Sequence, residues 1–274
     1  YLIEAMLEIM DEYLNDIYKN RFWGYSLPLY LSATIGCHPN YAIYLAEKDS
    51  LTVKAFNELL HCIPDEDKPR FSKEKAEKYY REFQQSYIDD KDAIEALTNK
   101  LDKKQVIILA PGKSINDCKE DVLSEIQKGN TIVIALNFCA DEFKPDFIFS
   151  SNMRRFVKIQ DKTSAKCIIT SNMKEARKKD FVVNYASYSL KSPDIIDNSG
   201  LMLVKLLISC GVKSVKIAGM DGYSMYYGNN YINTNLEYDF SKQAKKRNQL
   251  ISDELKELST AIKIEFITPT QYQY

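Results

Sequence analysis

Residues 105–114 read QVIILAPGKS, the clearest strand-to-helix signal in the chain. The run QVIIL is short and rich in β-branched residues, which is typical of a strand buried on both faces of a sheet. Pro111 and Gly112 then end the strand, and a helical pattern follows over about residues 116–127. A short buried strand followed directly by a helix predicts the first β–α unit of a parallel sheet.

The same alternation of strands and helices continues to the end of the chain. We expect strands at 105–109, 131–135, 146–149, 166–169, 181–183, 214–218 and 263–267, and helices at 116–127, 201–210 and 240–258. Short strands that alternate with longer helices form parallel sheets covered on both faces. The predicted fold class is therefore α/β, a Rossmann-like, mainly parallel sheet with helices on both faces, preceded by an all-helical N-terminal region.

The N-terminal part has a different pattern, in which apolar side chains recur at helical spacing. A charged segment flanked by prolines begins at Pro64. We therefore expect a helical region over residues 1–64, a charged linker helix over 65–103, and a Rossmann-like domain of the nucleotide-binding type over 104–274. Because the chain begins with Tyr1 and not with Met, we expect it to be a piece of a longer polypeptide.

Length, composition and charge exclude several classes of protein. The chain has 274 residues, of which 45% are hydrophobic and 27% charged, and its formal net charge is -1. The near-neutral charge argues against a nucleic-acid partner. No apolar run approaches the ~18 residues of a membrane span, and the acidic N-terminal sequence is not that of a signal peptide. The 6 cysteines stand far apart and only 2 histidines are present, so we expect a cytoplasmic protein with reduced thiols and no metal site.

In an open parallel sheet, ligands bind beyond the carboxyl ends of the strands, where the strand order reverses. The turn Gly112-Lys113-Ser114 follows the first predicted strand. Gly112 would let the backbone approach a ligand, and the next helix would offer its N–H groups to a phosphate. The turn is not a Walker A loop, because Ile107 stands where that loop has its earlier glycine. The alternative is a tight strand-to-helix turn without a ligand.

Polar residues also follow the second and third predicted strands. Asn137 could bind a base edge or a ribose, or it could serve only as a turn residue. Asn152 follows the third strand, and we assign it to the nucleotide-binding set. Arg154 and Arg155 come next, where they either bind a phosphate or point into solvent.

Ser199 and Gly200 open the most hydrophobic helix of the chain. We expect Ser199 to cap this helix and Gly200 to leave room for a ligand beside the first N–H groups. A plain N-cap without a ligand fits the sequence equally well. Two helix starts that face one pocket would be a stronger sign of an anionic ligand than either start alone.

Asp221 and Tyr223 are the candidate catalytic residues. Asp221 follows the strand at 214–218, where it could bind a ribose hydroxyl, hold a metal or act as a base. Tyr223 begins a segment rich in Tyr and Asn that runs to about residue 238. Such a segment is either a lid over the crevice or an ordered surface loop packed by its own tyrosines.

The N-terminal region resembles part of a known family. The stretches WGYSLPLY at 23–30, CHPNYA at 37–42 and LTV at 51–53 resemble the helical tail that follows the TIM barrel in HMG-CoA-lyase-like aldolases, often named 4-hydroxy-2-oxovalerate aldolases. The resemblance implies that residues 1–64 are such a tail, and that an aldolase barrel of the same longer chain is a partner. In that family of lyases the barrel supplies the metal ligands and the base, so this chain does not carry the aldolase chemistry.

The remainder, residues 104–274, is similar to the Rossmann-like family of archaeal 6-hydroxymethylpterin diphosphokinase and to the family-42 bacterial sialyltransferases. The resemblance implies that the turn Gly112–Ser114, Asn137, the helix start Ser199-Gly200 and the strand end Gly219–Asp221 surround a nucleotide. The sialyltransferases use a histidine base, whereas this chain has no histidine after His61. Asp221 or a tyrosine would have to replace it.

We therefore expect the domain to bind a nucleotide or a nucleotide-sugar, with glycosyl transfer in surface-polysaccharide synthesis as its reaction. The phosphate would lie between Gly112–Ser114 and Ser199–Gly200, and Asn137 and Asp221 would orient the nucleoside. The expected partners are this ligand, the aldolase barrel and a second copy of the chain in a homo-oligomer.

Two alternatives stay open. In the first, the domain is a non-catalytic scaffold that holds the oligomer of the aldolase, and side chains such as Met220 and Phe138 fill the crevice. In the second, the domain is a diphosphokinase-like transferase that needs magnesium, for which Asp221 and Asp197 are the candidate ligands. Outside this alternative the sequence assigns no particular cofactor.

Overall fold

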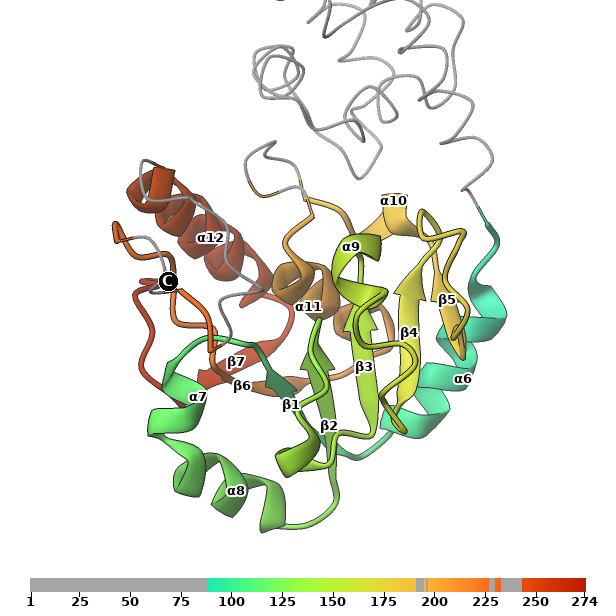
Figure 1. Cartoon of the computed structure of the whole chain (residues 1–274), viewed down its shortest axis with the longest axis horizontal. Helices are drawn as coiled ribbons and strands as arrows, with labels where there is room; N and C mark the ends of the chain where they lie inside the picture. Colours follow the sequence, from blue (N-terminus) through green and yellow to red (C-terminus); the bar gives the residue numbers. More distant parts are fainter. Residues whose placement is uncertain (1–87, 191–194, 196, 227–229, 233–242) are drawn as a thin grey trace, which may run out of the picture. The chain divides into compact units, whose positions relative to one another are not determined.

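The computed structural model describes residues 88–190, 195, 197–226, 230–232 and 243–274 (Figure 1). The helical region predicted over 1–64 and the first part of the predicted linker lie outside the described residues. By its contacts the chain divides into two compact units, and the elements described below belong to the unit made of residues 88–188 and 197–274.

The strands of the described part form one parallel sheet in the order β5-β4-β3-β2-β1-β6-β7. They are β1 (Gln105–Leu109), β2 (Thr131–Leu136), β3 (Phe147–Ser150), β4 (Lys166–Thr170), β5 (Phe181–Val183), β6 (Ser214–Ala218) and β7 (Lys263–Phe266). The predicted parallel α/β sheet is confirmed, and every predicted strand is present with small shifts at its ends.

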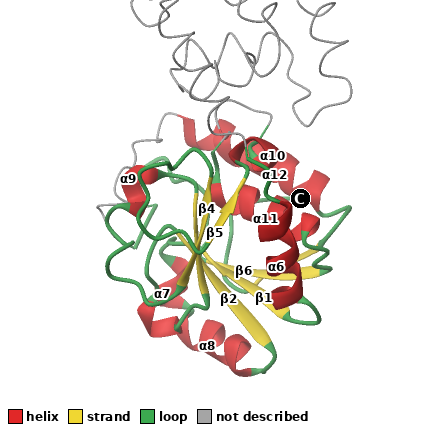
Figure 2. Ribbon diagram, turned by 90° about the vertical axis from the view of Figure 1, so that its right-hand side faces the viewer, coloured by secondary structure: helices red, strands yellow, loops and turns green. Residues whose placement is uncertain are grey.

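Helices lie on both sides of this sheet. They are α6 (Lys91–Leu101), α7 (Ser114–Asp117), α8 (Lys119–Gln127), the 3-10 helix η2 (Asp141–Phe143), α9 (Met153–Phe156), α10 (Tyr185–Tyr188), α11 (Ser199–Ser209) and α12 (Ala244–Leu258). Figure 2 shows α7, α8 and α9 on one side of the strands and α6, α11 and α12 on the other. The helix predicted over 116–127 is in fact two helices, because the backbone leaves helical dihedrals at Cys118.

The core is built as the sequence predicts for strands covered on both faces. Residues 106–109 of β1 are fully buried. Helix α11 is apolar on nearly all sides and lies against β3, α10 and α12, which is the environment expected for such a helix. Leu97 and Leu101 of α6 are also buried, so this helix belongs to the α/β unit although it falls in the predicted linker.

The order of the strands reverses beside β1. The chain passes from β1 to β2 on one side of it and returns with β6 on the other side. The turn after β1 and the turn after β6 therefore leave the sheet side by side at its carboxyl edge. This is the place where open α/β sheets bind their ligands.

Substitution of Leu97 by alanine tests whether α6 is part of the α/β unit. Because Leu97 is fully buried, L97A should lower the free energy of unfolding by about 2–5 kcal/mol, measured by urea denaturation. Glu95 is exposed on the same helix, and E95A should change the stability by less than about 0.5 kcal/mol. Equal effects of the two substitutions would show that α6 does not pack as described.

Candidate functional site

The turns after β1 and β6 contact each other through their backbones. The N–H of Ala110 donates to the carbonyl of Ala218 at 2.8 Å, and the N–H of Gly112 donates to that of Gly219 at 2.8 Å. A Cβ at Gly112 would lie 2.2 Å from the Gly219 oxygen and 2.6 Å from Cγ of Asp221. The sequence predicts a close approach of Gly112 to a ligand, but the groups that approach it here belong to the β6 turn.

The carboxylate of Asp221 lies at the start of α7. It accepts a hydrogen bond from the backbone N–H of Ser114 at 2.8 Å and another from the Ser114 hydroxyl. Burial raises the pKa of Asp221, while the hydrogen bonds from Ser114 and from the backbone of Lys113 act to lower it. Asp221 thus takes the N–H group of Ser114 that the sequence assigns to a phosphate.

The segment after β7 supports the same turn from the outside. Thr268 is buried, and its hydroxyl oxygen lies 2.8 Å from Oγ of Ser114 and accepts from the N–H of Gly219 at 2.9 Å. Further along, the hydroxyl of Thr270 donates to the carbonyl of Met220 at 2.8 Å. Sequence reasoning missed this support, because residues 268–270 carry no motif that names their partners.

A second polar cluster joins the carboxyl ends of β2 and β3 to the start of α11. The amide of Asn137 donates to Oγ of Ser199 at 2.9 Å, and its oxygen accepts from the Ser150 hydroxyl at 2.6 Å. Oγ of Ser151 lies 2.8 Å from Oγ of Ser199. Asn137, Ser150 and Ser151 are all buried. The structure therefore brings together Asn137 and Ser199, which are predicted separately, and adds Ser151, which the sequence does not single out.

Asn198, not Ser199, caps helix α11. Its side-chain oxygen accepts from the N–H of Leu201 at 3.1 Å, so the Ser199 hydroxyl is available for Asn137. Because Gly200 has no side chain, there is space beside the helix start, as predicted. The side chain of Met220 fills this space. A Cβ at Gly200 would be 3.1 Å from the sulfur of Met220. Met220 is one of the side chains that the scaffold alternative names for this position.

The two helix starts reach the carboxyl edge from opposite sides of the sheet (Figure 2). Two residues after β6 contact both helix starts. Asp221 accepts a hydrogen bond from Ser114, and Met220 lies beside Gly200. Both helix starts are thus approached by groups of the protein. A phosphate held between the two starts, as the sequence predicts, would compete with these two side chains for the same groups.

The remaining candidates have local roles. Asn152 is the N-cap of α9, where its side-chain oxygen accepts from the N–H of Arg155 at 3.3 Å. Tyr223 is held by the amide of Asn248, which accepts from the Tyr223 N–H at 2.8 Å and donates to its carbonyl at 2.9 Å. Burial raises the pKa of Tyr223 well above its ordinary value, so its phenol is a hydrogen-bond donor at neutral pH.

Metal ligands and membrane helices can be assessed for the described residues only. Among them, no three His, Cys, Asp or Glu side chains are grouped so as to hold a metal ion. Asp221 and Asp197, the ligands that the magnesium alternative names, are therefore not part of such a group. No helix of the described part has both the length and the apolar character that are needed to cross a membrane.

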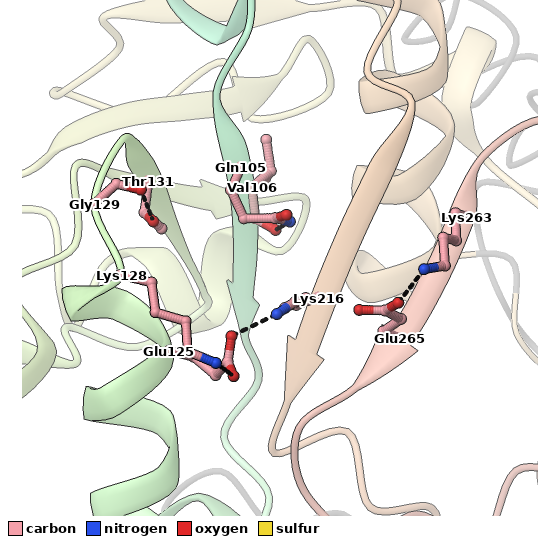
Figure 3. Close-up of polar contacts among 9 residues, drawn as sticks. All are labelled: Gln105, Val106, Glu125, Lys128, Gly129, Thr131, Lys216, Lys263 and Glu265. Carbon is pink, nitrogen blue, oxygen red and sulfur yellow. Dashed lines mark hydrogen bonds and ion pairs between the residues drawn. The ribbon is translucent and has the colours of Figure 1, made fainter.

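A hollow of about 550 Å³ lies elsewhere, between α8, β6 and β7. It is lined by Asp121, Ser124, Glu125, Lys216, Glu265, Phe266 and Ile267. Figure 3 shows Lys216 paired with Glu125, and Glu265 paired with Lys263. These pairs hold charged side chains on a solvated sheet face, and none of the candidate site residues lines the hollow.

Comparison with known proteins does not assign this chain to a family. No family model matches it, and no curated protein matches it. A function therefore has to be inferred from the carboxyl edge described above and from the resemblance in the sequence.

Substitution by alanine should change the free energy of unfolding to different extents at Gly112 and Gly200, the glycines beside the two helix starts. In G112A the new Cβ would meet the backbone of the β6 turn, so we expect a loss of at least about 1–3 kcal/mol of unfolding free energy. In G200A it would meet the flexible end of Met220, so we expect a change of less than about 1 kcal/mol. Urea denaturation of both variants makes the comparison, and a G200A effect as large as that of G112A would contradict it.

The raised pKa of Asp221 predicts a pH-dependent term in the stability. Its ordinary value is 3.8, and a group with a raised pKa in the folded state favours folding when protonated. This favourable contribution is present at low pH and is lost as the pH rises through the folded-state pKa. The side-chain amide that D221N introduces cannot titrate, so the melting temperature of this variant should shift upward relative to the unchanged protein between about pH 3 and pH 7.

The exposed Asp253 offers a matched control for this experiment, because D253N removes the same charge. Comparison of D221N with D253N separates the effect of the buried carboxylate from the loss of one negative charge. A D221N curve that runs parallel to that of the unchanged protein would show that burial does not affect Asp221 as described.

Proposed function

We propose that the α/β unit binds a nucleotide or a nucleotide-sugar at the carboxyl edge of its sheet, beside β1 and β6. The observation that carries this proposal is the position of Asp221 and Ser114 at the reversal of the strand order. Asn137 and Ser199 form the neighbouring polar cluster. The resemblance of the sequence to nucleotide-using transferases supports the same place.

Asp221 suits the ribose of such a ligand. An ionised carboxylate has about four acceptor positions. The N–H and the hydroxyl of Ser114 use two of them, and the backbone of Lys113 uses another. The position that remains can accept a hydrogen bond from a ribose hydroxyl. This role agrees with the contact between Asp221 and the start of α7, whereas a phosphate at Ser114 would have to displace the carboxylate.

The charge around the carboxyl edge favours an anionic ligand. Basic residues follow β1 and β3 and open α12, whose first turns contact the segment after β6 through Asn248. The acidic residue of these segments is Asp117, while Asp197 precedes α11 and the bonded Asp221 follows β6. Because the chain as a whole is nearly neutral, this local excess is not a general property of the protein. The basic residues are Lys113, Arg154, Arg155, Lys245, Lys246 and Arg247.

Glycosyl transfer is the reaction that we propose for a bound nucleotide-sugar, with a surface polysaccharide as the product. The acceptor hydroxyl needs a general base, and the described site offers Asp221 and Tyr223. Burial raises the pKa of both groups, which brings a carboxylate closer to neutral pH and moves a phenol further away from it. Asp221 is therefore the better base, and Tyr223 is the better hydrogen-bond donor.

The closure of both helix starts by side chains of the protein favours a second candidate, a non-catalytic scaffold. Met220 packs against Gly200, and Asp221 satisfies the N–H of Ser114. A domain whose helix starts are closed in this way needs no ligand to be stable. It would serve to hold copies of the chain together, and it would not respond to nucleotides.

Titration with nucleotides separates the two candidates. We expect CMP, UDP or their sugar conjugates at millimolar concentration to raise the melting temperature of the protein. A ligand at 100 times its Kd adds about 2.7 kcal/mol to the stability of the folded state. D221N should weaken this effect because it removes a ribose acceptor, whereas D253N should not. No shift with any of these ligands would overturn nucleotide binding and leave the scaffold.

A further inference from the structure

A row of hydrogen bonds ends at the carboxylate of Asp221. The hydroxyl of Ser114 bonds to this carboxylate, and Oγ of Ser114 lies 2.8 Å from Oγ1 of Thr268. Oγ1 of Thr268 lies in turn 2.9 Å from the backbone nitrogen of Gly219. Thr268 is 3% exposed and Ser114 is 9% exposed, so little water reaches either hydroxyl. The row joins the turn after β1, the turn after β6 and the segment after β7.

The backbone N–H of Gly219 fixes the direction of the hydrogen bonds in this row. A backbone N–H can only donate, so the hydroxyl oxygen of Thr268 accepts at this end. Ser114 has a single hydroxyl proton, and the ionised carboxylate of Asp221, which cannot donate, takes it. The proton at the contact between Ser114 and Thr268 must then come from Thr268. All hydrogen bonds of the row therefore point from Gly219 toward the carboxylate.

This direction favours the ionised form of Asp221. Hydrogen bonds that run head to tail polarise one another, so the donor that reaches the carboxylate is stronger than an isolated hydroxyl. If Asp221 carried a proton on the oxygen that faces Ser114, the row would have to reverse. The hydroxyl proton of Thr268 would then have no acceptor among the described residues. The row thus favours one charge state and one orientation of the carboxylate.

The other titratable groups around Asp221 do not have this effect. Burial raises the pKa of Asp221, and Asp117 of α7 raises it further, whereas the hydrogen bonds from Ser114 and from the backbone of Lys113 lower it. Tyr272 of the C-terminal segment is buried and stays protonated, because burial raises its own pKa. Of the groups that favour the carboxylate, the Ser114 hydroxyl is the one that continues to Thr268.

We propose that Thr268 is a positioning residue, which acts through Ser114 to hold the carboxylate of Asp221 ionised and in the orientation that accepts a ribose hydroxyl. The ligand class is that of the proposed function, a nucleotide or a nucleotide-sugar. The inference rests on the proposed function for this ligand. It does not rest on it for the effect of Thr268 on Asp221, which can be measured in the free protein.

Carboxyl ¹³C NMR of the free protein follows the titration of Asp221, whose signal is identified by its absence in D221N. T268V removes the hydroxyl and should raise the pKa of Asp221, whereas T268S keeps the hydroxyl and should leave the pKa unchanged. T270V is the matched control. The Thr270 hydroxyl also holds the turn after β6, at the carbonyl of Met220, but it is not part of the row. T270V should therefore not change the pKa of Asp221.

A double-mutant cycle shows whether Thr268 acts through Ser114. S114A removes the middle hydroxyl and keeps the backbone N–H that Asp221 also accepts. S114A should raise the pKa of Asp221, and T268V added to S114A should raise it no further. If T268V raises the pKa equally with and without the Ser114 hydroxyl, or does not raise it at all, the proposal is wrong. T268A removes the same hydroxyl and gives the same test if T268V does not fold.

Isothermal titration with UDP and with 2′,3′-dideoxy-UDP tests the orientation of the carboxylate. The two ligands differ only in the ribose hydroxyls, so the unchanged protein should bind UDP about tenfold more tightly, the effect of one hydrogen bond to a charged group. T268V should reduce this preference, and T268S and T270V should keep it. Lower stability alone would weaken both ligands alike and leave the preference unchanged. CMP and its dideoxy form replace this pair if CMP is the nucleotide that binds.

The NMR and binding measurements separate this inference from the proposed function. If T268V raises the pKa of Asp221 through Ser114 but no nucleotide binds, the effect of Thr268 on Asp221 stands and the proposed function is wrong. If T268V prefers the ribose hydroxyls as strongly as the unchanged protein does, the positioning role is wrong while nucleotide binding stands. If no nucleotide binds and T268V leaves the pKa unchanged, both are overturned.

Discussion

The hydrogen bonds between Asp221 and Ser114 are the interaction on which the carboxyl edge depends. They join the turn after β1 to the turn after β6, at the point where the strand order reverses. Gly112 makes this junction possible, since any side chain there would collide with the β6 turn. Thr268 closes the junction from the C-terminal segment. Because these contacts satisfy the start of α7 from within the protein, a ligand at this edge must use the groups that remain: the remaining acceptor position of Asp221, the polar cluster at Ser199, and the basic side chains.

The closure of both helix starts has one physical origin. Met220 and Asp221 are consecutive residues of the turn after β6, and they reach helix starts that lie on opposite faces of the sheet. One strand end therefore supplies an apolar contact to Gly200 and a charged contact to Ser114. The different chemistry of these contacts matters, because a thioether excludes a ligand from the α11 start while a carboxylate can still accept hydrogen bonds from one.

Sequence reasoning succeeded where the signal is local. The strands were predictable because buried parallel strands read as short runs of β-branched and aromatic residues, as in QVIIL at 105–109. The sequence is less informative about which groups contact each other across the fold. A glycine such as Gly112 indicates that something approaches the backbone, but not whether this is a ligand or another turn. Thr268 could not be recognised, because its partner Ser114 lies 154 residues earlier in the chain. The cap of α11 was assigned one residue too late because Asn198 and Ser199 are both good caps, and the contact between Ser199 and Asn137 that separates them is not local.

The ionisable group at position 221 bears on the choice between ligand binding and a purely architectural role. A tie between the two turns needs only an acceptor for the N–H and the hydroxyl of Ser114, and the neutral amide of an asparagine could accept one or both. Burial of a carboxylate at this point is unfavourable for folding, as its raised pKa shows. The hydrogen bonds from Ser114 and Lys113 favour the charged form and are stronger to a carboxylate than to an amide, so an architectural role accounts for part of the charge. The proposed general base gives a further reason, because it requires a basicity that a carboxylate has and an amide lacks.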